Sequence, residues 1–117
     1  MLECSSYTFK NSKTFTIKSK FNCYSSNVIY VIICHGCNEE YIGETSMQLK
    51  QRLVLYREHI KHKQYQMIEV EEHLRECGKG NFFMFPILQV KQNDTIIRRN
   101  LEANLIKKYE PSLNRRK

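Results

Sequence analysis

Four residues with metal-ligating side chains fall into two closely spaced pairs. Cys34 and Cys37 form a C-x-x-C pair around His35-Gly36, a sequence typical of a tight turn, and His73 and Cys77 form an H-x-x-x-C pair just before a glycine. On a helix, residues four positions apart point the same way, so the second pair can present an imidazole and a thiolate together. Four nitrogen and sulfur ligands with no open position are typical of structural Zn²⁺. The sequence therefore predicts a zinc site.

Other interpretations of these residues stay open. The H-x-x-x-C pair shares an apolar stripe with Val70 and Leu74, so both of its members could be core residues. His35 and His62 are weaker alternative ligands. A C-x-x-C pair alone could also be redox-active, but no βαβ pattern surrounds it here.

Hydrophobic patterns predict the strands that must position these residues. Val28–Cys34 is apolar and rich in β-branched residues, as expected of a central strand buried on both faces, and residues 39–43 follow a turn as its antiparallel partner. Three further strand candidates follow from the same kind of pattern: residues 7–9, 14–17 and 82–90. Asn11-Ser12 predicts a hairpin between the first two, and Pro86 in the last indicates an edge strand or a break.

Apolar residues at helical spacing predict three helices. The first begins near Thr45 or Ser46, either of which can cap it. The second spans roughly residues 67–76, and the third runs from an Asp94 cap to about residue 108. The third helix is expected to bury three apolar side chains: Ile97, Leu101 and Leu105. The order of elements indicates a small α+β fold with helices on a mainly antiparallel three-stranded sheet.

Size and charge limit the class of protein. The chain has 117 residues, the size of one domain, and a net charge of +7, which favours nucleic acid as a partner. Its longest apolar run, Val28–Cys34, is seven residues long, whereas a membrane span needs about 20. We therefore expect no membrane association and an intracellular protein. Five cysteines without a signal peptide argue against disulfides, and Cys4 and Cys23 are expected to be buried thiols.

Two tyrosine motifs lie eleven positions apart on the paired strands: Val28-Ile29-Tyr30 and Tyr41-Ile42-Gly43. Arg52 follows on the first helix, Glu102 on the third, and Pro111-Ser112-Leu113-Asn114 after it. In this order and spacing the chain resembles the GIY-YIG nuclease family over nearly all of its length after the hairpin.

The form it resembles most is the endonuclease domain of Penelope-like retroelements. The segments Asn22–Tyr30 and Tyr41–Thr45, with a C-x-x-C between them, carry this likeness. In that subgroup two cysteines of the core hairpin pair with later ligands in a zinc-finger-like site, in agreement with the zinc prediction. The resemblance implies a GIY-YIG domain over residues 22–117 with an embedded zinc site, preceded by a β-hairpin extension over residues 1–21.

The resemblance also implies roles for single residues. Glu102 matches the glutamate that binds one divalent cation, Mg²⁺ or Mn²⁺, and no other acid of the chain is expected on that cation. Arg52 matches the arginine that contacts the scissile phosphate, where a guanidinium forms charge-assisted hydrogen bonds. Tyr30 and Tyr41 match the motif tyrosines, one of which orients or deprotonates the attacking water. Asn114 matches a late asparagine that braces the site.

Two positions depart from the family pattern. Val28 replaces the first glycine. Tyr56 stands where the subgroup usually places a histidine, four residues after Arg52, and a histidine follows at His59. Both side chains share a helical face with Arg52, so either could reach the site.

The resemblance predicts a metal-dependent DNA endonuclease or nickase. In a retroelement it would cut target DNA to expose a 3′-hydroxyl for reverse transcription, as one domain of a longer polyprotein with a reverse transcriptase, in the nucleus. The alternative is a catalytically inactive, zinc-stabilised nucleic-acid-binding module, which Tyr56 favours.

Overall fold

The computed structural model describes residues 6–17, 21–22, 24–62, 68–91 and 93–114. Its elements, in chain order, are β1 (Ser6–Thr8), β2 (Thr14–Thr16), β3 (Val28–Cys34), β4 (Glu40–Thr45), α1 (Leu49–Lys61), α2 (Glu69–Glu76), β5 (Phe82–Gln89), α3 (Thr95–Tyr109) and a final 3₁₀ turn (Ser112–Asn114). No helix in these ranges is long and apolar enough to cross a membrane.

The main sheet has three antiparallel strands in the order β4-β3-β5. β3 lies in the centre, and its side chains are buried on both faces, as its apolar sequence predicted. β5 is an edge strand, and its pairing with β3 is irregular: Ile29 pairs with Leu88, but Tyr30 pairs with Pro86. Because proline cannot donate to a ladder, the edge position and the irregularity agree with the expectation from Pro86.

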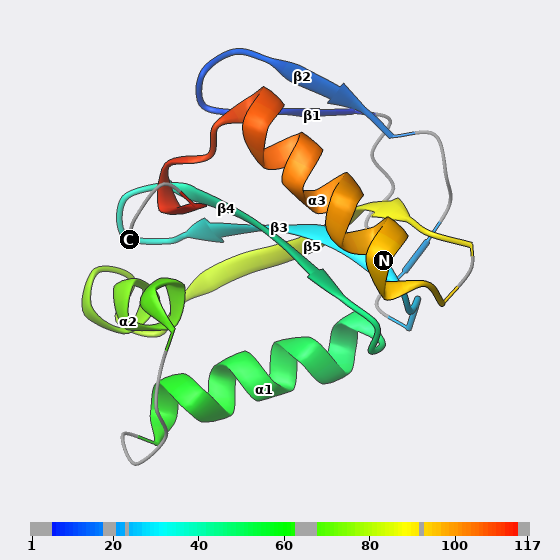
Figure 1. Cartoon of the computed structure of the whole chain (residues 1–117). Helices are drawn as coiled ribbons and strands as arrows, with labels where there is room; N and C mark the ends of the chain where they lie inside the picture. The colour runs from blue at the N-terminus through cyan, green and yellow to red at the C-terminus, as the bar shows by residue number, and fades with distance from the viewer. Residues whose placement is uncertain (1–5, 18–20, 23, 63–67, 92, 115–117) are drawn as a thin grey trace.

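Helices cover both faces of this sheet (Figure 1). α1 and α2 lie on one side, where Tyr30 and Ile32 of β3 belong to one buried cluster. α3 and the β1–β2 hairpin lie on the other side, where Ile29 and Val31 belong to a second cluster. Because strand side chains alternate, β3 supplies both clusters, and the α+β fold predicted from the sequence is confirmed.

The β1–β2 hairpin forms as predicted and is part of the second cluster. Phe9 is 2% exposed and stacks on Tyr109 of α3 at 4.6 Å between ring centroids. The buried carboxylate of Glu40 accepts hydrogen bonds from the Lys10 backbone N–H, at 3.0 Å, and from the Tyr7 hydroxyl. The hairpin therefore shields the start of β4 and the end of α3 from solvent.

The expected start of the first helix is wrong. Thr45 still pairs with Val28 in the sheet and is buried, so β4 runs through it. Its hydroxyl accepts a hydrogen bond from the Met47 N–H, which makes a turn rather than a helix cap. Neither Thr45 nor Ser46 caps α1, which begins at Leu49.

The third helix begins at its predicted cap but is rotated from the expected orientation. The Asp94 side chain accepts hydrogen bonds from the backbone N–H groups of residues 96 and 97. Ile97, expected in the core, is 42% exposed, whereas Arg98 is 4% exposed. Leu101 and Leu105 pack against the second cluster as expected. The rotation places Arg98 against an acidic partner on β4, described below.

Candidate active site and metal centre

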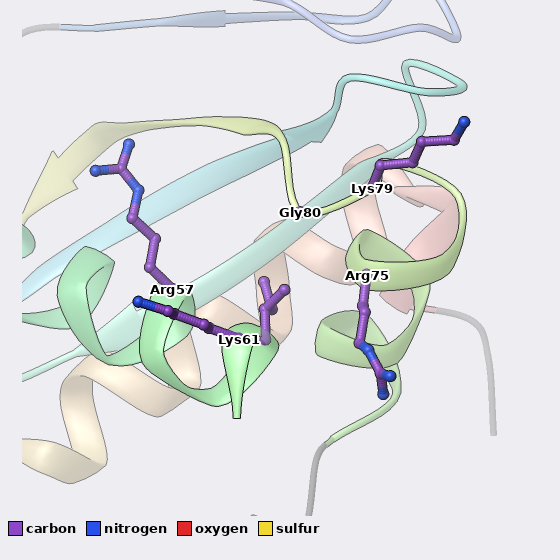
Figure 2. Close-up of a pocket in the computed structure, with 6 residues that line it drawn as sticks. Arg57, Lys61, Arg75, Lys79 and Gly80 are labelled. Carbon is purple, nitrogen blue, oxygen red and sulfur yellow. The ribbon is translucent and has the colours of Figure 1, made fainter. Parts of the chain in front are cut away.

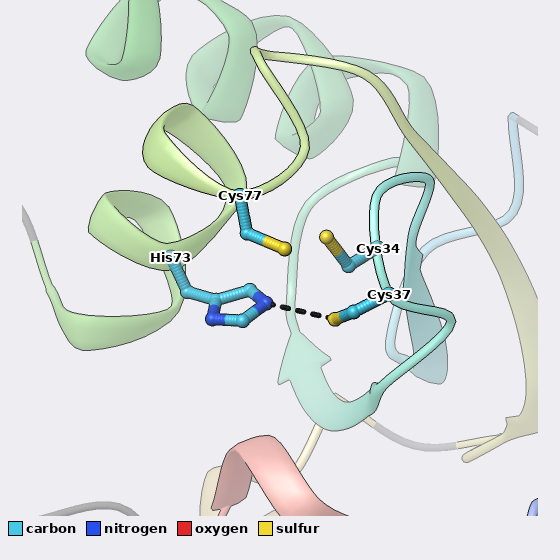
Figure 3. Close-up of side chains that lie close together, drawn as sticks. All are labelled: Cys34, Cys37, His73 and Cys77. Atoms are coloured by element: carbon cyan, nitrogen blue, oxygen red, sulfur yellow. Dashed lines mark hydrogen bonds between the residues drawn. The ribbon is translucent and has the colours of Figure 1, made fainter.

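The four predicted zinc ligands meet at one end of the main sheet. Cys34 ends β3, Cys37 lies in the following turn, and His73 and Cys77 come from α2 and the residue after it. Their ligand atoms all lie within 4.8 Å of one another, and Cys37 Sγ lies 3.2 Å from His73 Nε2. Figure 3 shows the Cys77 and Cys34 sulfurs facing each other beside this pair.

This arrangement fits zinc. A tetrahedral ion with Zn–S bonds of about 2.3 Å needs ligand atoms roughly 4 Å apart. Among the described residues, this cluster includes neither His35 nor His62: the His35 ring packs near Phe83 at 5.8 Å, and His62 Nε2 lies 3.1 Å from a Glu58 oxygen. The chain thus contains a Cys₃His cluster that could hold zinc.

A glycine allows the turn to approach α2. A Cβ at Gly36 would lie 2.2 Å from the Cys77 carbonyl oxygen, so no other residue fits without displacing the backbone. The close approach also places the thiols in contact. Hydrogen bonding with Cys37, then burial, then hydrogen bonding with Cys34, raise the pKa of the Cys77 thiol to about 11. A bound cation would replace the shared protons, because zinc ligands bind as thiolates.

A second group of polar side chains gathers between α1 and β4. The hydroxyls of Tyr30 and Tyr56 lie 2.7 Å apart in the core, and the Arg52 guanidinium lies 4.3 Å from the centre of the Tyr56 ring. Gly43 pairs with Tyr30 across the sheet, and a Cβ there would lie 2.5 Å from the Tyr30 hydroxyl. The second motif therefore needs its glycine, because this glycine leaves space for the phenol of Tyr30.

Burial keeps the phenols protonated. It raises the pKa of Tyr30 to about 12, although the charge of Arg52 lowers it. Burial also raises the pKa of Tyr56 and of Tyr41. Tyr30 is 1% exposed, whereas Tyr41 retains some exposure. At neutral pH these side chains can therefore donate hydrogen bonds, and Tyr41 is the motif tyrosine that solvent can reach.

Glu102 of α3 approaches this group from the other side of β4. α3 packs against β4, and the charge of Glu102 is a further cause of the raised pKa of Tyr41, after burial and the charge of Tyr56. Burial and the charge of Glu44 raise the pKa of Glu102 to about 7, against the opposing effect of two arginines. The ionised carboxylate is thus held in a place where a cation would stabilise it.

Arg98 and Glu44 form an ion pair that the sequence did not reveal. Arg98 Nε donates to Glu44 Oε1 at 2.5 Å, and Arg99 Nε lies 3.8 Å from Glu44 Oε2. Arg98 therefore forms its ion pair with Glu44 and not with Glu102, four residues further along its own helix. The strand alternation was the usable signal, because it places Glu40 and Glu44 on the face of β4 toward the hairpin and α3.

Asn114 and His59 lie in different places. The Asn114 side chain forms two hydrogen bonds with the backbone of Ile42 on β4. Its Oδ1 accepts from the Ile42 N–H at 2.6 Å, and its Nδ2 donates to the Ile42 carbonyl at 2.9 Å. His59 Nδ1 lies 2.7 Å from Glu71 Oε2, a carboxylate that is 2% exposed at the start of α2. The structure thus gathers five predicted site residues, holds Asn114 of the final 3₁₀ turn against β4, and places His59 against α2. The gathered residues are Tyr30, Tyr41, Arg52, Tyr56 and Glu102.

Several sequence predictions lie outside the described residues. They concern Cys4 and Cys23, which were expected to be buried thiols. Residue 67, the expected start of the second helix, is also outside, and α2 begins at Glu69.

A carboxylate that would favour a cation, beside an arginine and hydrogen-bond donors, suits metal-assisted chemistry on phosphate esters. A family model of the GIY-YIG catalytic domain matches residues 26–117. This region includes the Cys₃His cluster and all five residues of the candidate active site. The chain belongs to this family of metal-dependent nucleases, hydrolases for which DNA is the substrate. No curated protein matches the chain, and no solved structure does.

Proposed function

We propose that this domain is a metal-dependent DNA endonuclease that hydrolyses phosphodiester bonds at the edge formed by β4. The observation that carries the proposal is the packing of α3, which carries Glu102, against β4, which carries Tyr41, with Arg52 stacked on the Tyr56 ring. Three elements that are distant in the sequence contribute these side chains. A half-buried carboxylate whose ionisation is disfavoured is typical of functional sites, and cation binding would favour its ionised form.

Each residue has a distinct role in this proposal. Glu102 would hold one divalent cation, Mg²⁺ or Mn²⁺, which when bound stabilises negative charge on the phosphate and on the leaving oxygen. Arg52 binds the scissile phosphate through charge-assisted hydrogen bonds. Tyr41 orients the water whose oxygen attacks phosphorus as the bond to the leaving oxygen breaks. Tyr30 and Tyr56 are buried in the core next to Arg52 and position its guanidinium.

Because the phenols of Tyr30 and Tyr41 stay protonated, they are better suited to orienting the attacking water than to removing its proton. A base must lose its proton near neutral pH, and burial opposes this for Tyr30 and Tyr41. Water that loses its proton during attack therefore passes it to solvent or to the phosphate. We further propose that Cys34, Cys37, His73 and Cys77 bind one structural zinc ion.

The biological setting is a separate proposal that rests on resemblance to Penelope-like retroelements. The domain would nick target DNA to supply a 3′-hydroxyl for target-primed reverse transcription. It would belong to a longer polyprotein with a reverse transcriptase and would work in the nucleus. The division into a hairpin extension over residues 1–21 and a nuclease domain over residues 22–117 likewise stays a prediction.

The alternative function is an inactive, zinc-stabilised nucleic-acid-binding module. Tyr56 is the observation that favours it: this residue replaces the subgroup's histidine, is buried, and directs its hydroxyl to Tyr30. Such a hydroxyl cannot shuttle protons as a histidine near its ordinary pKa can.

A supercoiled-plasmid assay tests the two functions. With Mg²⁺ or Mn²⁺, the natural chain is expected to produce nicked circles, and Glu102→Gln to lose at least about a hundredfold in rate while still binding DNA. Glu110 is an exposed residue after α3, so Glu110→Gln removes the same charge and serves as the control. If the natural chain binds DNA without cutting it and Tyr56→His cuts, the binding module is the correct function.

A further inference from the structure

A pocket lined by cations lies at the far end of α1. It has a volume of about 390 Å³ and lies between α1, α2 and the turn before β5 (Figure 2). Its lining residues are Arg57, Ile60, Lys61, Arg75, Lys79 and Gly80. Four of the six are basic and none is acidic, so the pocket has a strongly positive rim.

The fold makes no evident use of these charges. Within the described ranges, none of the four basic side chains takes part in an ion pair. By contrast, Arg98 and Arg99 pair with Glu44. Arg57, Lys61 and Lys79 are exposed. Unpaired cations on one surface attract a polyanion and gain binding energy by releasing its counterions.

The directions of the side chains indicate which kind of anion fits. Figure 2 shows the ends of Arg57, Lys61, Arg75 and Lys79 pointing in different directions and not toward a common centre. A single small phosphate needs convergent donors. A nucleic-acid backbone presents a row of phosphates and can be contacted by cations spread along a path.

The distance between the pocket and the candidate active site can be compared with the spacing of phosphates along DNA. Lys61 follows Arg52 by nine positions on the same helix, which is ~13.5 Å along its axis. Along the axis alone this corresponds to roughly four phosphates of one strand at about 3.4 Å each, which is the shortest path between the two sites. Around the helix, Arg57 is turned about 140° and Lys61 about 180° from Arg52, so DNA reaching these cations must cross the exposed face of α1. Lys50 precedes Arg57 by two helical turns on that face and is also exposed.

Two of the four cations lie beside the Cys₃His cluster in the sequence. Arg75 lies between the ligands His73 and Cys77 on α2, and Lys79 follows Cys77 by two residues. Holding the end of α2 to the β3–β4 turn therefore also holds Arg75 and Lys79 opposite the end of α1.

We propose that this basic pocket binds the DNA backbone at least about four nucleotides from the cleaved bond, and that the Cys₃His cluster, with zinc bound, positions it. The proposal rests on the proposed nuclease function and adds a second contact with the same substrate. It assigns the Cys₃His cluster a part in substrate binding as well as in folding.

The test measures duplex DNA binding at several salt concentrations in a Glu102→Gln background, in which cleavage does not interfere. The test variant combines Lys61→Gln, Arg75→Gln and Lys79→Gln. A matched control removes three exposed lysines elsewhere: Lys91→Gln, Lys107→Gln and Lys108→Gln. Zinc content and melting temperature verify that each variant is folded. If the triple variant does not fold, the exposed single variants Lys61→Gln and Lys79→Gln replace it.

We expect the test variant to bind on the order of tenfold more weakly, with the slope of log K against log salt reduced by about 2.7, which is 0.9 for each of three lost phosphate contacts. The control should stay within twofold of its parent. Equal loss in both variants, or no loss in the test variant, would overturn the proposal. So would displacement of DNA by millimolar inorganic phosphate from the parent alone, because that indicates a small-anion site. Plasmid cleavage by the natural chain is scored separately, so the nuclease function can stand if this contact fails.

Discussion

Glu102→Gln should stabilise the metal-free domain at pH 8 and have little effect on its stability at pH 4. Burial and the nearby charge of Glu44 raise the pKa of Glu102 to about 7 in the folded domain. Below its ordinary pKa the carboxyl is protonated in both the folded and the unfolded chain, so it contributes nothing. As pH rises toward 7, the unfolded chain releases this proton first, and the stability of the fold falls. Above 7 the penalty is complete, and the neutral amide of glutamine avoids it.

The size of the effect follows from the shift. A rise from 4.5 to about 7 corresponds to at most ~3.4 kcal/mol, at 1.36 kcal/mol for each pH unit. Glu102 is only half-buried, so solvent screening reduces this to about 1 kcal/mol. For a domain of this size, that difference raises the melting temperature by about 4 °C.

Thermal unfolding at pH 4, 6 and 8 measures this difference, with Glu110→Gln as a control for the loss of one exposed charge. A second arm adds Mn²⁺ at pH 8, which should raise the melting temperature of the natural chain but not that of Glu102→Gln, because a ligand stabilises the state that binds it. Equal or lower stability of Glu102→Gln at every pH would refute the electrostatic reasoning. Equal stabilisation of both proteins by Mn²⁺ would refute the assignment of Glu102 as the ligand.

Three further substitutions test the parts of the fold that support the site. Cys34→Ser should reduce bound zinc, measured by elemental analysis, and lower the melting temperature, because a structural metal contributes folding energy; full zinc content would contradict this. Phe9→Ala should cost about 3–5 kcal/mol in urea unfolding, because it empties the stacked position on Tyr109; a loss below 1 kcal/mol would mean that the hairpin is dispensable. Gly43→Ala should cost about 1–3 kcal/mol, since its Cβ meets the Tyr30 phenol; plasmid nicking should fall with it, and unchanged nicking would argue against a role for that phenol.

Features with strong local signals were predicted correctly. The apolar, β-branched run Val28–Cys34 is typical of a central strand, and Asp94 carries a side chain suited to capping a helix. The cysteine and histidine pairs specified their own cluster, because each pair is local and the two have few alternative partners. The family motif added the distant Glu102, which no spacing argument reaches.

The errors arose where tertiary contacts override local preference. Thr45 is a good helix cap by residue type, but pairing with Val28 keeps it in the strand. Ile97 was expected inside, yet burying Arg98 lets its guanidinium pair with Glu44, and the helix turns accordingly. A partner 54 positions away in the sequence cannot be inferred from helical periodicity.

β4 explains how remote parts of the chain affect one site. Its side chains alternate, so Tyr41 and Gly43 face α1, while Glu40 and Glu44 face the hairpin and α3. Asn114 forms hydrogen bonds with the backbone of Ile42, in the middle of this stretch of β4. A shift of β4 by a fraction of an ångström would therefore move the motif tyrosine and the environment of Glu102 together. The hairpin contacts at Glu40 and the C-terminal contact at Ile42 restrain that shift, so changes in either segment should alter cleavage without touching a reacting group.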